Sequence, residues 1–144
     1  MLQKLSFTSV LAAVIQKVQA NTGLRCYDGV PLNAVKPFYH AEFLGSIPEP
    51  GKTMQKDRYQ VVIHVYADAP EGSSVQIYDA IHKLEEALSE EIALPGDYEV
   101  TLQTPNGVSQ ILNEVDKTKH AVIGYDFVVF SGYKMKNIGG IINE

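Results

Sequence analysis

Apolar residues recur near the start of the chain at the spacing of an amphipathic helix. Over residues 5–20 they return every three or four positions, and lysines and glutamines occupy most of the opposite face. Ser6 is placed to cap the start of this helix. Gly23 follows its end and tolerates the left-handed conformation that closes many helices. The pattern therefore predicts one helix between Ser6 and Gly23.

A second helical stretch covers residues 74–91. Its apolar stripe faces one way, and glutamates and a lysine form the solvated side. Ser73 stands three residues before Gln76, which is the spacing of a capping box. Residues 94–97, which include a proline and a glycine, end the element.

Alternating apolar and polar positions predict strands in the rest of the chain. The predicted strands cover residues 24–27, 38–45, 57–66, 98–103, 108–115 and 121–130. Residues 57–66 are apolar on both faces, which is typical of a strand central to its sheet. Residues 46–55 hold two prolines and a glycine and predict an exposed loop, and residues 105–107 predict a turn.

The predicted order is helix, three strands, helix, three strands. Short strands joined by tight turns favour antiparallel pairing, and two amphipathic helices suffice to cover one face of the sheet. We therefore predict an α+β fold with a mostly antiparallel sheet and two helices packed on one face. Residues 1–131 form the single predicted domain, and residues 132–144 show no clear period and predict a flexible C-terminal tail.

Composition narrows the function classes. The chain has 144 residues, and 12 Lys and Arg against 17 Asp and Glu leave a net charge of −5. This sign disfavours a protein whose whole surface binds nucleic acid or anionic lipid. The longest apolar runs are far shorter than the ~20 residues of a membrane-spanning helix, so we expect a soluble protein with no membrane partner. A single cysteine excludes an internal disulfide and a cysteine-based zinc site.

Two histidines provide the main candidate for chemistry. His40 and His64 fall on consecutive predicted strands, and Glu42 lies near them. Paired imidazoles with a carboxylate can hold a divalent metal, so a small metal-dependent enzyme is the alternative function. A solvated cross-strand pair explains the same residues without a metal. His120 follows two lysines in a predicted turn and is interpreted as an exposed surface residue.

Other enzymatic signals are weak. Cys26 lies in a short apolar strand, where a buried thiol is inert. No serine occupies a Gly-x-Ser-x-Gly motif, and the Gly-Lys-Thr at residues 51–53 lacks the earlier glycine of a phosphate-binding loop. Lysines around residues 52–58 and 117–136 allow local phosphate contacts, which leaves a nucleic-acid-binding module as a third hypothesis. We expect no enzymatic activity and no cofactor.

Apolar residues outside any periodic element indicate contacts with other proteins. We predict that the turn at residues 28–34, the loop at residues 46–54 and the C-terminal tail carry these contacts. The predicted interface residues are Val30, Pro31, Leu32, Ile47, Pro48, Met54, Lys134, Lys136 and Ile138.

A family resemblance covers residues 5–131. Residues 27–38 read Tyr-x-x-Val-Pro-x-Asn-Ala-x-x-Pro-Phe. Three further features follow in order: a strand that carries His64, the Gly-Ser-Ser at residues 72–74, and the aromatic strand at residues 121–130. In this order of features the chain resembles the tail-completion, or tail-to-head joining, proteins of long-tailed bacteriophages and prophages.

The resemblance implies a non-enzymatic structural protein of the virion tail. It implies a ring of identical subunits, commonly a hexamer, at the head-proximal end of the tail tube. There the ring ends tube growth and joins the head connector, and DNA passes through its lumen. The implied partners are further copies of the chain, the tail-tube protein and the connector, met in the host cytoplasm during assembly.

Overall fold

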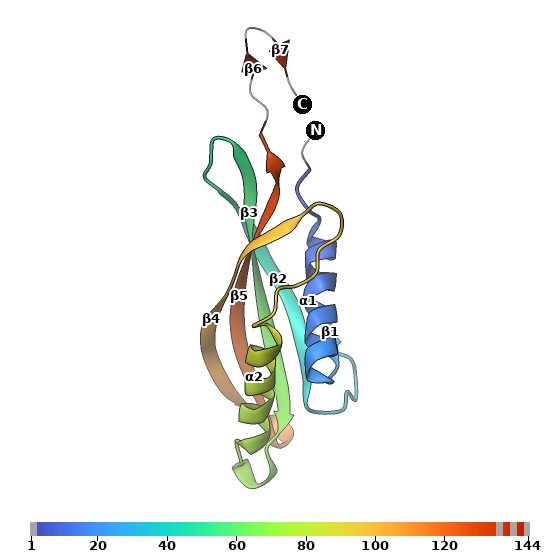
Figure 1. The fold of residues 1–144 in the computed structure, drawn as a ribbon. Helices are drawn as coiled ribbons and strands as arrows, with labels where there is room; N and C mark the ends of the chain where they lie inside the picture. Colours follow the sequence, from blue (N-terminus) through green and yellow to red (C-terminus); the bar gives the residue numbers. More distant parts are fainter. Residues whose placement is uncertain (1–2, 135–136, 139–140, 143–144) are drawn as a thin grey trace.

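The computed structural model describes residues 3–134, 137–138 and 141–142 and forms a twisted sheet with two helices laid on it (Figure 1). The elements in chain order are α1 (Phe7–Thr22), β1 (Cys26–Tyr27), β2 (Phe38–Glu49), β3 (Met54–Asp68), α2 (Val75–Ala87), β4 (Glu99–Glu114), β5 (Thr118–Tyr133), β6 (Asn137–Ile138) and β7 (Ile141–Ile142). Two short 3₁₀ turns, Pro70–Gly72 and Val115–Lys117, follow β3 and β4.

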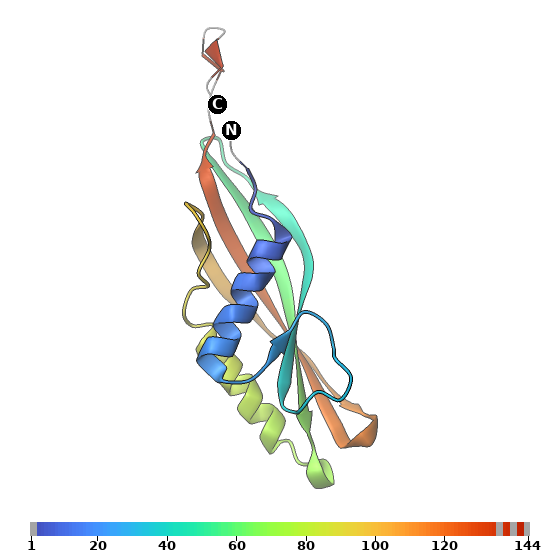
Figure 2. The ribbon, with the colours of Figure 1, turned by 90° about the vertical axis from the view of Figure 1, so that its right-hand side faces the viewer.

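The sheet has the strand order β1-β2-β3-β5-β4. Every neighbouring pair in it is antiparallel except the short β1, which runs parallel to β2. Figures 1 and 2 show α1 and α2 on the same face of this sheet. The predicted α+β class, with a mostly antiparallel sheet and both helices on one face, is confirmed.

The start of α1 follows the predicted capping pattern. The hydroxyl of Ser6 accepts a hydrogen bond from the backbone N–H of Ser9, and Gly23 has a φ of 75° and donates its N–H to the carbonyl of Gln19. The capping box predicted for α2 is wrong. Ser74 occupies the cap position, and the side chain of Gln76 instead accepts from the backbone N–H of Asp68. Tertiary contact with the end of β3 therefore outweighs the local motif.

The core lies between the helices and the sheet. Alternate residues of β3 from Tyr59 to Ala67 are buried against α1 and α2, in agreement with the central position predicted for this strand. Two buried tyrosines also bond to backbone across the core. Tyr39 donates its hydroxyl to the carbonyl of Ala80 in α2, and Tyr59 donates to the carbonyl of Leu5 ahead of α1. These hydroxyls keep their hydrogen bonds while the rings fill the core.

The exposed loop predicted at residues 46–55 is wrong over most of its length. β2 continues to Glu49 and β3 begins at Met54, so only Pro50–Thr53 connects them. Pro48 pairs with Asp57 inside this hairpin. β1 covers β2 only at Tyr39 and His40, so Pro48 lies where the other side of β2 has no neighbour. Proline is tolerated on such an edge, because no ladder hydrogen bond is lost there.

The turn predicted at residues 105–107 is also wrong. β4 runs through it without a break and pairs along β5, with register shifts between Pro105 and Val108 and between Val108 and Gln110. The chain reverses at Val115–Lys117 instead. The Pro-Asn-Gly sequence therefore produces irregular pairing within one long strand, because its neighbour β5 continues straight past it.

The end of β5 passes the start of the predicted tail. β5 continues to Tyr133, opposite Met54, and the N–H of Lys134 donates to the carbonyl of Thr53. Within the part of the chain that the structure describes, β6 and β7 pair with each other and with no further strand. The division into a domain at 1–131 and a flexible tail stays a prediction.

Candidate functional site

A row of four polar side chains crosses the sheet on the face away from the helices. We call Glu42, His64, His120 and Glu114 the histidine row; they come from β2, β3, β5 and β4 in that spatial order. Nε2 of His64 lies 3.0 Å from Oε1 of Glu42, and Nδ1 of His64 lies 2.8 Å from Nε2 of His120. Nδ1 of His120 lies 3.0 Å from Oε1 of Glu114. The row therefore ties four strands together through side chains.

A second row crosses the same strands nearer the β2–β3 turn. Arg58 donates to Glu49 at 3.1 Å and to Asp126 at 2.8 Å. Asn106 of β4 donates to the other oxygen of Asp126 at 3.0 Å. Hydrogen bonds to the two carboxylates raise the pKa of Arg58, so the guanidinium stays charged. This row also links β2, β3, β5 and β4.

His40 and His64 are directly paired across β2 and β3, and their ring centroids lie 5.1 Å apart. Nδ1 of His40 is buried without a hydrogen-bond partner. Burial and the neighbouring His64 lower the pKa of His40, so the neutral ring is favoured. Both nitrogens of His64 are already bonded, to Glu42 and His120.

This geometry does not support the metal-enzyme hypothesis. Within residues 3–134 and the short β6 and β7 segments, no group of three or more His, Cys, Asp or Glu residues is arranged to hold a metal ion. The interpretation of His120 as an exposed turn residue is wrong. His120 lies in β5, its side chain is 12% exposed, and its ring stacks on Tyr66 at 4.3 Å between centroids. The preceding lysines suggested a turn, but the turn ends three residues before His120, at Lys117.

The thiol of Cys26 is buried, as the sequence indicated. Desolvation raises its pKa to about 12, despite the opposing effect of a backbone hydrogen bond at Ala41. A thiol with such a pKa has almost no thiolate at neutral pH and is not a nucleophile.

The predicted interface residues lie at two ends of the molecule. Val30, Pro31 and Leu32 occupy the β1–β2 connection, where Leu32 is 94% exposed. Ile47 and Pro48 lie at the far end of β2, about nine residues of strand or roughly 30 Å from Phe38.

Met54 and Lys134 lie near this far end. Met54 begins β3 opposite Tyr133, and Nζ of Lys134 donates to the carbonyl of Gly51 at 2.7 Å. Ile138 belongs to β6, and Lys136 lies outside the described residues. Their role in contacts, like that of the residues at both ends of β2, stays a prediction.

β4 forms an exposed edge of the sheet that the sequence pattern does not predict. This strand is the last in the sheet order, so its outer backbone has no neighbour among the strands described. Its second half exposes aliphatic side chains, of which Ile111 is 42% exposed. The exposed set is Val108, Ile111, Leu112 and, just past the strand, Val115. The apolar residues of this run were visible in the sequence, but their exposure depends on which strand forms the edge.

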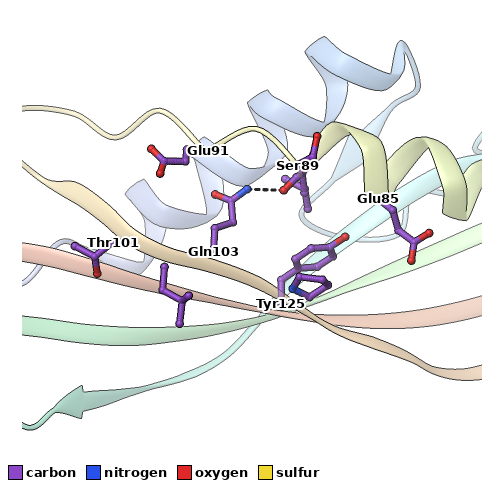
Figure 3. Close-up of a pocket in the computed structure, with 9 residues that line it drawn as sticks. Glu85, Ser89, Glu91, Thr101, Gln103 and Tyr125 are labelled. Atoms are coloured by element: carbon purple, nitrogen blue, oxygen red, sulfur yellow. Dashed lines mark hydrogen bonds between the residues drawn. The ribbon is translucent and has the colours of Figure 1, made fainter.

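A groove of about 450 Å³ lies between the end of α2 and the first half of β4 (Figure 3). Gln103 organises its wall: its amide nitrogen donates to the carbonyls of Leu88 and Glu90 at 2.8 and 2.6 Å, and its oxygen accepts from the N–H of Ile92. Glu85 and Glu91 place carboxylates along the groove. The groove therefore has an acidic rim and a firmly held wall.

Comparison with known proteins identifies the family. A family model described as "Putative tail termination protein", of the phage tail terminators, matches residues 1–137, and the chain belongs to this family. Membership makes it a structural protein of the phage tail. No curated protein sequence matches the chain.

A solved structure has a similar fold. A chain of "Virion of native gene transfer agent (GTA) particle" aligns with a TM-score of 0.63 and 17% sequence identity. The alignment covers 87% of this protein and 99% of that chain. At this identity the likeness establishes a shared fold. Across the ranges that the structure covers, no helix has the length and apolar character needed to cross a membrane.

Proposed function

We propose that the protein forms a ring, a hexamer in the assembled virion, at the head-proximal end of the tail tube. There it ends tube growth and joins the tail to the head connector. The observation that carries this proposal is the membership of residues 1–137 in the tail termination family. The protein acts through contacts with its own copies, the tail-tube protein and the connector, and DNA only passes through the lumen.

The distribution of exposed apolar residues supports ring formation. A ring is built from heterologous contacts, in which one surface of a subunit meets a different surface of the next. The chain offers such surfaces in separate places: the β1–β2 connection around Leu32, the β2–β3 end around Ile47, and the edge strand β4. A subunit with several unlike contact surfaces suits a component that meets the tube, the connector and its own copies.

The non-enzymatic role is part of the proposal. The histidine row saturates both nitrogens of His64 and the buried thiol of Cys26 is un-ionised, so neither provides a reactive group. We place the protein in the virion tail, and in the host cytoplasm while the tail assembles.

Deletion of the gene in its phage or prophage tests the function. We expect tails of uncontrolled length that are not attached to heads, measured by electron microscopy of lysates. A plasmid copy of the natural gene is expected to restore tails of normal length that are joined to heads. A copy that stops early in α1 is not expected to do so. Tails of normal length joined to heads in the deletion strain would refute the proposal.

Light scattering and negative-stain images of the purified protein test the ring. We expect particles of six times the chain mass with a central hole, either in isolation or on the ends of purified tail tubes. Tubes capped by single subunits would contradict the hexameric ring. Whether the protein ends tube growth would then be decided by the deletion experiment.

A further inference from the structure

The outer edge of β4 has no neighbour among the strands described. β4 is 16 residues long, and every residue from Pro105 to its end at Glu114 is exposed. Natural edge strands are commonly protected by lysines, prolines and β-bulges. β4 contains no lysine, and Pro105 and the register shifts beside it interrupt the edge only near its middle. An edge of this length with exposed aliphatic side chains favours pairing with a further chain.

The two halves of this edge differ in chemistry. The first half begins at Glu99 and borders the groove with Glu85 and Glu91, and no ion pair among the described residues holds any of these three carboxylates. The second half exposes the aliphatic residues from Val108 to Leu112. With the two groove carboxylates, the first half of β4 is the more acidic, and the second half carries most of the exposed aliphatic residues before it ends at Glu114.

The C-terminal segment of the chain has the matching order. Lys134 and Lys136 come first, and Ile138, Ile141 and Ile142 follow. Laid parallel to β4, this segment brings its lysines to the acidic half and its isoleucines to the aliphatic half. Both the charges and the apolar residues are then complementary.

Lys134 bonds to the carbonyls of Thr53 and Gly51, but the described residues after it join no larger sheet. Among the strands described, β6 and β7 pair with each other, as two-residue strands. A two-stranded hairpin alone is marginally stable in water. Figures 1 and 2 both show β6 and β7 beyond the end of the sheet, away from the long edge of β4.

We propose that the outer edge of β4 binds the C-terminal segment of a neighbouring copy, residues 134–142, as an added parallel strand. This contact rests on the proposed ring and supplies its subunit–subunit link. The other free edge of the sheet, on β2, fits the edge of β4 less well. β2 contains no lysine and carries Glu42 and Glu49, so it offers no positive charge to the acidic half of β4.

Photo-crosslinking of the full-length protein tests the contact. Light and ¹⁵N-labelled chains carrying p-benzoyl-phenylalanine in place of Ile141 are mixed, irradiated, and digested for mass spectrometry. We expect crosslinks to residues 106–114 that join one light and one heavy chain. The same probe in place of Lys136 is expected to reach residues 85–105, because the segment runs parallel to β4.

Two variants and a control test whether the apolar edge of β4 and the charge of Lys136 hold the segment in place. Ile111→Lys adds a lysine to the edge and is expected to lower the crosslink yield about tenfold or more. Lys136→Glu is expected to lower it similarly, since it places a carboxylate beside Glu85 and Glu91. Val75→Lys introduces a lysine at an exposed residue of α2, outside the edge of β4, and is expected to leave the yield unchanged. Circular dichroism checks that each variant is folded.

Three results would overturn the contact. They are crosslinks confined to single chains, crosslinks to surfaces other than β4 and the groove, and no crosslinks at the highest concentration at which the chain stays in solution. A hexameric ring that forms without these crosslinks would refute the docking and leave the proposed function standing. If the expected crosslinks form but the deletion strain still makes tails of normal length joined to heads, the docking stands and the proposed function is refuted.

Discussion

Nδ1 of His64 lies 2.8 Å from Nε2 of His120, so two imidazoles on neighbouring strands are joined directly. Their outer nitrogens face Glu42 and Glu114. The histidine row therefore links the edge strand β4 to β2 across the sheet through side chains.

A double-mutant cycle tests this coupling. We expect His64→Ala and His120→Ala each to lower the free energy of unfolding, and the double variant to lose less than the sum by about 0.5–3 kcal/mol. Urea denaturation measures all four proteins. A cycle that pairs His64 with His82, whose side chain is 70% exposed on α2, provides the control and should be additive. Additivity of His64 with His120 would contradict the hydrogen-bonded row.

His40 makes stability depend on pH. Burial and His64 lower its pKa below the ordinary value of 6.5, and the opposing carboxylates of Glu42 and Asp28 do not cancel this effect. The unfolded chain therefore binds a proton at His40 more readily than the folded chain. Its contribution to stability is present above about pH 6.5 and is lost as the pH falls through the lower, folded-state value.

The change of unfolding free energy between pH 7.5 and 5.5 measures this contribution. We expect His40→Asn to weaken the acid-induced loss, because residue 40 then no longer titrates. His82→Gln removes an exposed histidine of α2 and is the matched control for the loss of one histidine. A steeper loss of stability at low pH in His40→Asn would show that the sign is wrong.

Gln103 fixes the connection between α2 and β4. Its side chain bonds to the backbone of Leu88, Glu90 and Ile92. We expect Gln103→Ala to lower the free energy of unfolding by about 1–3 kcal/mol, because these groups lose their partner. Hydrogen exchange at the amide of Ile92 should accelerate as well. Thr101→Ala changes a neighbouring groove residue that bonds only to Val128 and should leave this amide protected.

The thiol of Cys26 should react only when the fold opens. Because it is buried and burial raises its pKa to about 12, we expect a thiol reagent such as DTNB to label the native protein at the rate of opening. In urea the labelling should become fast. Immediate stoichiometric labelling of the native protein would contradict the buried position of Cys26.

Features that depend on neighbours in the sequence were predicted well. The spacing of apolar residues predicted both helices, and Ser6 and Gly23 marked the ends of α1 because caps bond within one turn. The alternation of residues 57–66 predicted the central strand β3, since a strand buried on one face and partly covered on the other must be apolar on both.

Prolines and glycines misled the prediction of turns. Pro48 and Pro105 lie within strands, because each occupies a strand with an open side where a missing N–H costs little. Which side of a strand is open depends on the strand order, and that order arises from contacts between residues far apart in the chain.

The sequence by itself determined the α+β class, both ends of α1, the central strand and the likeness to tail-completion proteins, because these follow from periodicity and local motifs. Only the tertiary structure decided that His120 joins His64, that Arg58 joins Glu49 to Asp126, and that β4 is the exposed edge. The physical reason is register: side chains meet across a sheet only after the pairing of distant strands has set which residues lie opposite one another.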